Sequence, residues 1–202
     1  MIIRERYDRL APLYDAVDLA EVLYKRQVRP RLFAGLEGRI LDVGVGTGRN
    51  IPFYPPGARV VGLDLSPGML ARARRRAARL GRPVDLVATD VLGTGFPDGC
   101  FDAVVSAFMF CVLDERVQRQ ALAELARVCR PGGEIRVLDY AFSRRRWLRL
   151  LMELWQPWEK LVFGAAFNRH TDRYIAQAGL ELLREESFVG DMVRLLVART
   201  PA

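Results

Sequence analysis

The stretch Ile40-Leu-Asp-Val-Gly-Val-Gly-Thr-Gly-Arg-Asn50 decides the fold of this chain. It opens as a short β-branched run that predicts a strand over 39–43, and it then enters a glycine-rich turn that leads toward a helix. In an open α/β sheet, ligands bind beyond the carboxyl ends of the strands. Glycines at that point let the backbone approach a ligand and adopt positive φ. The turn therefore predicts a ligand site at the end of the first strand.

Outward from this turn, strands alternate with helices. The spacing predicts further strands over 59–63, 84–88, 101–106 and 134–140, with helices opening at Ser66-Pro67 and spanning 115–128. Such alternation indicates a parallel α/β sheet. The flanking parts are expected to contain a helical region over 2–36 with breaks at Pro12 and Pro30, a turn over 130–133, helices over 144–164 and 171–178, and an antiparallel hairpin of strands 181–188 and 191–199 joined at Gly190.

Acidic residues end successive predicted strands. Asp64 ends the second strand, 22 residues after Asp42, where a carboxylate can accept hydrogen bonds from both hydroxyls of a ribose. Asp90 follows the third strand and can accept from an adenine amino group. Because the carboxyl ends of parallel strands meet at one edge of a sheet, these side chains predict a nucleoside site.

The glycine spacing distinguishes among nucleosides. The dinucleotide fingerprint is G-x-G-x-x-G, but here the glycines are 44, 46 and 48, and Arg49 stands where the third fingerprint glycine would be. The pattern D-x-G-x-G-x-G resembles the first motif of class I S-adenosylmethionine methyltransferases, and the alternative is an unrelated Rossmann-like nucleotide binder. Further stretches match that family in order over residues 37–140: Val61–Leu70, Ala88–Val91, Phe96–Ser106 and Arg127–Gly133.

The resemblance implies a fold and a domain organisation. We expect a Rossmann-like, doubly wound α/β sheet of seven strands in the order 3-2-1-4-5-7-6, with strand 7 antiparallel. The chain is expected to be a single methyltransferase domain over 1–202, with an N-terminal helical cap over 1–36, a cofactor-binding core over 37–140, and a substrate lid with a C-terminal hairpin over 141–202.

The resemblance also assigns cofactor-binding roles. Asp42 and the turn would hold the amino-acid end of S-adenosylmethionine, and Asp64 would bind the ribose hydroxyls. The other expected cofactor contacts are Gly44, Gly46, Gly48 and Asn50 in and after the turn, Leu65 and Met69 against the adenine, Asp90 and Val91 at its amino group, and Ala107 with Phe108 at the methionine part.

The N-terminal stretch Tyr7-Asp-Arg-Leu-Ala-Pro-Leu-Tyr-Asp15 resembles the opening of ubiquinone and menaquinone biosynthesis methyltransferases and of bacterial phospholipid N-methyltransferases. That resemblance implies a helix that folds over the cofactor, with Tyr14 closing the pocket and Tyr7 reaching the substrate. Simple packing of an amphipathic helix is the alternative for both tyrosines.

Candidates for catalysis are few. An amine or carbon nucleophile needs a base when it must lose a proton; the chain has one histidine, His170, and Tyr140 lies just past the fifth predicted strand. A structural role is the alternative for each. The three cysteines are odd in number and contain no Cys-x-x-Cys pair, which argues against a disulfide scaffold and a zinc site, so no metal is expected.

Charge and tryptophan both gather in the expected lid. The net charge is +7, and Trp147, Trp155 and Trp158 lie in one stretch with four arginines, Arg144, Arg145, Arg146 and Arg149. Such a composition suits a membrane interface, and the alternative is a lid packed on the sheet with a solvated basic rim. The N-terminal region adds Arg4, Arg6, Arg9, Lys25, Arg26, Arg29 and Arg31, whereas Arg72, Arg74, Arg75, Arg76 and Arg79 are expected on a solvated helix face.

These features together indicate an S-adenosylmethionine-dependent methyltransferase that releases S-adenosylhomocysteine and acts on a lipophilic acceptor at an anionic membrane surface. Our first choice of acceptor is the amine of phosphatidylethanolamine. A quinone precursor or a small thiol or lipophilic metabolite is the alternative, and an RNA methyltransferase or a non-catalytic cofactor-binding protein ranks below these. Nucleic acid is not expected as a partner, because Ser106-Ala-Phe-Met stands where base amino methyltransferases carry a Pro-Pro-Tyr motif. The charged N-terminus and the absence of a long apolar run predict a cytoplasmic protein, peripheral at the inner face of the membrane.

Overall fold

The computed structural model describes residues 3–17 and 20–202, apart from the side chains of residues 17–25. Of the N-terminal helical prediction, residues 2, 18 and 19 lie outside the described residues, as does the side chain of Lys25.

A mixed sheet of seven strands forms the centre of the molecule, in the order β3-β2-β1-β4-β5-β7-β6. Strand β7 pairs antiparallel with both β5 and β6, while the pairs from β3 to β5 are parallel. The predicted fold class is therefore confirmed. The strands are β1 (Arg39–Val43), β2 (Arg59–Asp64), β3 (Asp85–Ala88), β4 (Phe101–Ala107), β5 (Cys129–Tyr140), β6 (Glu181–Phe188) and β7 (Val193–Arg199).

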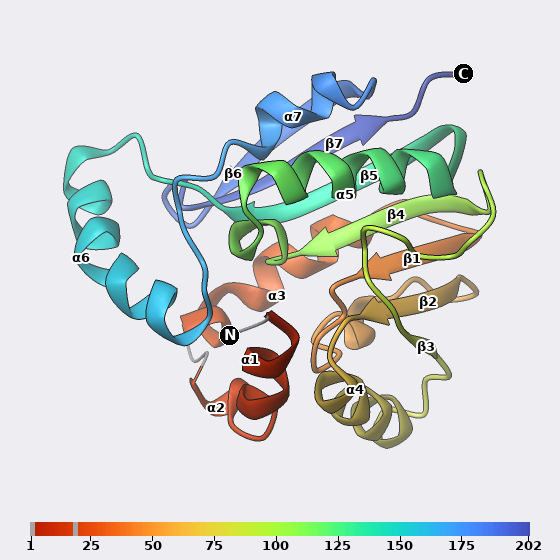
Figure 1. Cartoon of the computed structure of the whole chain (residues 1–202), viewed down its shortest axis with the longest axis horizontal. Helices are drawn as coiled ribbons and strands as arrows, with labels where there is room; N and C mark the ends of the chain where they lie inside the picture. Colours follow the sequence, from red (N-terminus) through yellow and green to blue (C-terminus); the bar gives the residue numbers. More distant parts are fainter. Residues whose placement is uncertain (1–2, 18–19) are drawn as a thin grey trace.

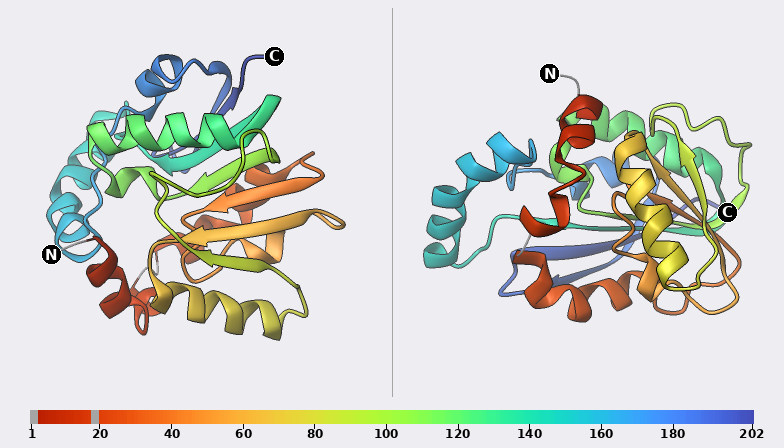
Figure 2. Two further views of the ribbon diagram at one scale, coloured as in Figure 1. Left: turned by 45° about the vertical axis from the view of Figure 1, so that its right-hand side comes forward. Right: turned by 90° about the horizontal axis from the view of Figure 1, so that it is seen from below.

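Helices cover both faces of this sheet (Figures 1 and 2). One buried cluster joins the sheet to α5 and α7, and a second joins it to α3 and α4. The helices are α1 (Ile3–Leu10), α2 (Tyr14–Val17), α3 (Ala20–Phe33), α4 (Pro67–Arg79), α5 (Glu115–Val128), α6 (Arg146–Val162) and α7 (Thr171–Gln177), with short 3-10 turns η1 (Ile51–Phe53) and η2 (Phe110–Val112).

The helix that follows β2 begins where the sequence predicts. The Ser66 hydroxyl accepts a hydrogen bond from the amide of Met69 at 3.1 Å, and Pro67 occupies the first helical position. Both residues stabilise a helix N-terminus. The serine hydroxyl accepts a hydrogen bond from an amide that has no partner within the helix, and proline has no amide hydrogen that would be left without one. The result fixes the first turn of α4 directly beside the end of β2.

Two local predictions were wrong. Helix α3 continues through Pro30 to Phe33, because Leu32 and Phe33 are buried in the core and hold the last turn against the sheet. The expected turn over 130–133 belongs to β5, which begins at Cys129 and pairs with Phe101 of β4 before the register shifts. Gly132, at φ +68°, lies within this irregular part of the strand.

The strand directions set the position of the site. Figure 1 shows the arrowheads of β1, β2 and β4 pointing toward the side of the molecule that carries α1 and α6. Figure 2 shows α6 at that side, set off from the sheet. The glycine turn after β1 therefore faces the N-terminal helices.

Candidate functional site

A cavity of about 320 Å³ lies between the carboxyl ends of the central strands and helix α1. That volume is in the range of small-molecule sites. Its walls are mostly apolar, and they bring together the following residues predicted from the sequence: Tyr7, Tyr14, Gly44, Gly46, Asp64, Leu65, Met69, Asp90, Val91, Ala107 and Phe108.

Asp64 holds the glycine turn to the end of β2. Its Oδ2 accepts a hydrogen bond from the amide of Gly46 at 2.8 Å, and its Oδ1 accepts from the amide of Ser66 at 2.9 Å. Burial raises the pKa of Asp64, and the hydrogen bonds from the backbone amides of Ser66, Gly46 and Leu65 counter that rise in part. Each carboxylate oxygen has a second lone pair, so the side chain can accept further hydrogen bonds from a ligand in the cavity.

The turn itself requires bare backbone. Gly44 has φ +72°, and a Cβ there would lie 2.9 Å from the Cβ of Met109. Gly46 also has positive φ and lines the cavity. A side chain at either position would be strained, and at Gly46 it would stand beside the space for the ligand.

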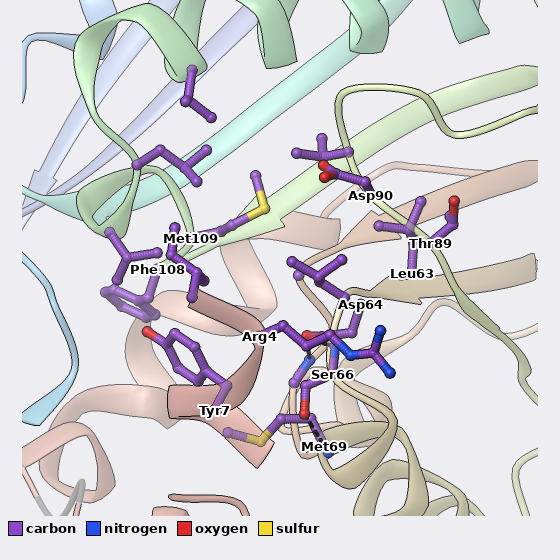
Figure 3. Close-up of a pocket in the computed structure, with 18 of the residues that line it drawn as sticks. Arg4, Tyr7, Leu63, Asp64, Ser66, Met69, Thr89, Asp90, Phe108 and Met109 are labelled. Atoms are coloured by element: carbon purple, nitrogen blue, oxygen red, sulfur yellow. Dashed lines mark hydrogen bonds between the residues drawn. The ribbon is translucent and has the colours of Figure 1, made fainter. Parts of the chain in front are cut away.

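Asp90 completes the acidic edge of the cavity. Its Oδ1 accepts from the amide of Leu92 at 3.0 Å, which orients the side chain in the loop after β3. Figure 3 shows Asp64, at the end of β2, and Asp90, in the loop after the neighbouring strand β3, with Tyr7 and Phe108 together on the other side of the cavity. The arrangement suits a nucleoside, with one carboxylate for the sugar and one for the base edge.

Three residues predicted to bind the cofactor, Asp42, Gly48 and Asn50, are buried toward the core and do not line the cavity. The buried Asp42 accepts hydrogen bonds from Asn50 Nδ2 at 2.9 Å and from the Tyr54 hydroxyl at 2.6 Å, and Arg29 donates to Asn50. Burial raises the pKa of Asp42 to about 6. A Cβ at Gly48 would lie 2.5 Å from Ile51 Cδ1. In this structure Asp42, Gly48 and Asn50 support the turn from the core side.

The N-terminal cap is tied to the site by two aspartates. Asp8 accepts from the Ser66 hydroxyl at 2.5 Å and from the amide of Gly68 at 3.0 Å. The hydrogen bond from Ser66 lowers the pKa of Asp8 more than its slight burial raises it. Helix α1 is thus bonded to the start of α4, beside Asp64.

Asp15 forms the second connection, which we call the cap latch: Asp15 with Thr47, Arg49 and Arg76. It accepts from the Thr47 hydroxyl at 2.8 Å, Arg49 Nε at 3.0 Å and an Arg76 terminal nitrogen at 2.6 Å. Burial raises the pKa of Asp15, but the donated hydrogen bonds outweigh it and the net shift is downward. The latch joins the cap to the glycine turn.

Two arginines differ from their sequence-based placement. Arg76 is not on a purely solvated face, because it reaches the latch from α4. Arg29 is not part of an exposed basic rim: only 5% of it is accessible, and its guanidinium lies 5.5 Å from the ring centre of Phe108. Each arginine is held by residues distant in sequence: Arg76 by Asp15, and Arg29 by Asn50 and Phe108.

The candidate catalytic residues are not all brought together. Tyr7 donates a hydrogen bond from its hydroxyl to the carbonyl of Phe163 at 3.1 Å, and burial raises its pKa well above the usual value. Tyr140 packs on Phe108 with ring centres 4.7 Å apart, in a smaller compartment beside the main cavity. His170 is exposed and lines a separate polar cavity with Arg144 and Arg149, away from the candidate site.

Fold and site together define a Rossmann-like nucleoside-binding protein with a cap over its ligand cavity. The profile of a family described as a methyltransferase domain matches residues 40–133. By similarity to such proteins, and to the relatives below, the chain belongs to the S-adenosylmethionine-dependent methyltransferases. The predicted family is therefore confirmed, and S-adenosylmethionine is the cofactor of that family.

Three curated relatives illustrate the range of acceptors. A phosphatidylethanolamine N-methyltransferase of Cereibacter sphaeroides is 43% identical over 53% of this chain and 52% of its own length. Demethylmenaquinone methyltransferases of Thermus thermophilus and Deinococcus radiodurans are 38% and 32% identical, over 66% and 88% of this chain and 64% and 70% of theirs. The match thus spans little more than half the length of the first of these relatives.

Two solved structures share the fold. The putative methyltransferase bound to the Haloferax volcanii Trm112 activator has a TM-score of 0.77 at 18% identity, covering 100% of this chain and 98% of that one. Phosphoethanolamine N-methyltransferase 2 of Haemonchus contortus, solved with S-adenosyl-L-methionine, has a TM-score of 0.73 at 15% identity, covering 100% of this chain and 60% of that one.

Proposed function

We propose that this chain transfers a methyl group from S-adenosylmethionine to the amine of phosphatidylethanolamine at an anionic membrane surface. The observation that carries the proposal is the run of exposed apolar side chains on α6. This helix stands on the side of the molecule toward which β1, β2 and β4 point (Figure 1), and the ends of β2 and β4 line the cofactor cavity. The name of the Cereibacter sphaeroides relative supports the acceptor.

The residues around the cavity fit the cofactor. Asp64 offers carboxylate lone pairs, Gly44 and Gly46 offer bare backbone, and the remaining walls are largely apolar. When bound, S-adenosylmethionine supplies an activated methyl group, so the protein has mainly to position the acceptor and exclude water. In this proposal Asp64 and Asp90 bind the nucleoside, and Tyr7 and Tyr14 of the cap cover it.

Helix α6 carries an apolar stripe that no part of the described chain covers fully. Only Leu148 and Met152 of this helix are buried. Residues at helical spacing form the stripe: Trp147, Leu150, Leu151, Leu154, Trp158 and Leu161, each at least 47% exposed. Exposed apolar patches of this kind mark interaction surfaces.

The charges around the stripe favour a lipid bilayer as its occupant. Arg144, Arg145 and Arg146 are exposed at the start of α6, and Lys160 is exposed near its end. Tryptophans with flanking cations suit the headgroup level of an anionic bilayer. Among the described residues, the structure has no helix with the length and apolar character needed to cross a membrane. The proposal is therefore peripheral binding, with α6 lying in the interface.

The decisive experiment measures methylated lipid and vesicle binding together. Leu154 and Leu161 are 72% and 76% exposed, and losing about half the burial of two leucines removes about 2 kcal/mol, roughly 30-fold in partitioning. We expect Leu154→Ser/Leu161→Ser to bind anionic phosphatidylethanolamine vesicles that much more weakly with unchanged S-adenosylmethionine affinity. The matched control, Leu80→Ser/Leu182→Ser, changes two exposed leucines elsewhere and should behave as the parent.

Two results would reject the proposal. One is the absence of methylated lipid from the parent protein across a range of anionic mixtures. The other is vesicle binding by the α6 variant equal to that of the parent, which would leave a protein partner as the occupant of the stripe.

C-methylation of a quinone precursor is the second candidate function. The demethylmenaquinone methyltransferases match over a larger share of this chain than the phospholipid enzyme does. A parallel assay with a demethylated quinol in the same vesicles separates the two: product from the quinol and none from the lipid would favour this alternative.

A further inference from the structure

A second, smaller compartment adjoins the cofactor cavity. The two share Tyr7, Tyr14, Phe108 and Val112 as walls. The compartment is closed on its far side by residues of the lid and strand ends: Cys111, Tyr140, Glu159, Phe163 and Ala165. Its volume is about 20 Å³, which is enough for roughly one water molecule.

Aromatic rings form most of this compartment. The rings of Tyr7 and Tyr14 lie 6.2 Å apart, and Tyr14 meets Phe163 edge-on at 5.6 Å. On the other side, Tyr140 packs on Phe108 at 4.7 Å. Ring faces are negative because of their quadrupole, and cages of such rings bind ammonium cations.

Among the described residues that line the compartment, Glu159 is the one carboxylate. It comes from α6, and its Oε1 accepts a hydrogen bond from the indole nitrogen of Trp155 at 2.8 Å. Its Oε2 has no hydrogen-bond partner among the described residues, so that oxygen is available to a ligand. Burial raises the pKa of Glu159, and the hydrogen bond from Trp155 offsets part of that rise.

We propose that this compartment binds the amine of the acceptor as an ammonium cation, with Glu159 as its counter-ion and the three ring pairs named above as its walls. Glu159 then takes one proton from the bound ammonium, and the neutral amine attacks the methyl group of S-adenosylmethionine and displaces S-adenosylhomocysteine. The inference rests on the proposed function and deepens it, because it makes the chain selective for amines. A neutral hydroxyl acceptor would gain little from the rings, and a phenolate would be repelled by the carboxylate.

The compartment must widen before the amine of an acceptor can enter it. An alkylammonium group is larger than a water molecule, so Glu159 and Phe163 must move outward before it can enter. Glu159 is half-buried in the last turn of α6, and Phe163 is buried directly after that helix, both beyond Leu148 and Met152 in the chain. We therefore expect acceptor binding to shift this end of α6 and to leave the first two turns in place.

Glu159→Gln tests the proposal, since glutamine keeps an oxygen for Trp155 and removes the charge. In the parent with S-adenosylhomocysteine bound, tetramethylammonium chloride should bind saturably, measured by saturation-transfer NMR against an equal concentration of sodium chloride. The variant should bind it roughly tenfold to a hundredfold more weakly, with unchanged S-adenosylhomocysteine affinity and melting temperature. Its KM for phosphatidylethanolamine should rise by a similar factor.

Glu153→Gln is the matched control, because Glu153 lies on the same helix, is exposed and pairs with Arg149. It should match the parent in every measurement. If Glu159→Gln does not fold, Phe163→Leu removes one wall and should weaken tetramethylammonium binding instead.

The two proposals fail in different ways. Tetramethylammonium binding that is equal in the parent and in Glu159→Gln overturns the ammonium site, even when the parent methylates lipid. Binding that depends on Glu159 in a protein that methylates no phosphatidylethanolamine supports the site and overturns the lipid acceptor.

Discussion

Replacing Asp64 by asparagine tests the cofactor site at its most connected residue. The carboxylate accepts hydrogen bonds from the amides of Gly46 and Ser66, and it has further lone-pair capacity for the ribose hydroxyls. Hydrogen bonds to a charged group contribute about 1.5–3 kcal/mol each. Loss of the charge while one amide oxygen remains should therefore cost about 3 kcal/mol of cofactor binding, roughly a hundredfold in Kd.

The assay is titration calorimetry with S-adenosylmethionine and S-adenosylhomocysteine, with thermal unfolding in parallel. Asparagine can accept only one of the two backbone amides well, so unfolding should become easier by about 1–3 kcal/mol. Asp102→Asn is the control. Asp102 accepts a hydrogen bond from the amide of Arg39 at the amino ends of β4 and β1, away from the cavity, so its replacement should affect stability alone. Cofactor affinity that is unchanged in Asp64→Asn would refute the reasoning.

Two further predictions concern stability and the cap. Burial raises the pKa of Asp139 from 3.8 to about 6, so the folded state holds this proton more tightly than the unfolded state, and the protein loses stability as pH rises between those values. The free energy of unfolding of the parent should therefore fall by about 3 kcal/mol more than that of Asp139→Asn between pH 3.5 and 7. Denaturant unfolding at both pH values measures the difference, and an equal change in the two proteins would exclude this role of Asp139. Asp15→Asn weakens the partly exposed cap latch by about 1 kcal/mol, so stopped-flow release of S-adenosylhomocysteine should be roughly fivefold faster; an unchanged release rate would remove the latch from the site.

The parts of the fold that are local in sequence could be predicted. Alternating strands and helices gave the sheet, and the cap at Ser66 gave the start of α4, because each depends on residues within a few positions. The acidic strand ends could be placed in one cavity for the same reason: in a parallel sheet, Asp64 and Asp90 must emerge at one edge.

Contacts between distant segments could not be predicted in this way. Arg76 lies on an arginine-rich helix, and nothing local distinguishes it from its neighbours, yet it pairs with Asp15 sixty-one positions earlier. Pro30 reads as a helix break until the packing of Leu32 and Phe33 is known. Glu159 belongs to no motif that the sequence analysis identified, and it lies beside Tyr7 and Tyr140 only in the folded chain.

His170 is a residue that the sequence singled out for catalysis but that the fold places away from the candidate site. A single histidine attracts attention in a sequence because its ordinary pKa suits proton transfer. The fold places it on a polar cavity that Arg144, Arg149, Phe142 and Phe167 also line, and that cavity shares no lining residue with the candidate site. Composition alone could not indicate which cavity it would line.

A structure of the protein with S-adenosylhomocysteine bound tests the central claim most directly. We expect the ribose hydroxyls within hydrogen-bond distance of Asp64, the adenine beside Met69 and Asp90, and the sulfur directed toward the tyrosines of the cap. A nucleoside bound elsewhere on the molecule, or one whose ribose makes no contact with Asp64, would contradict it.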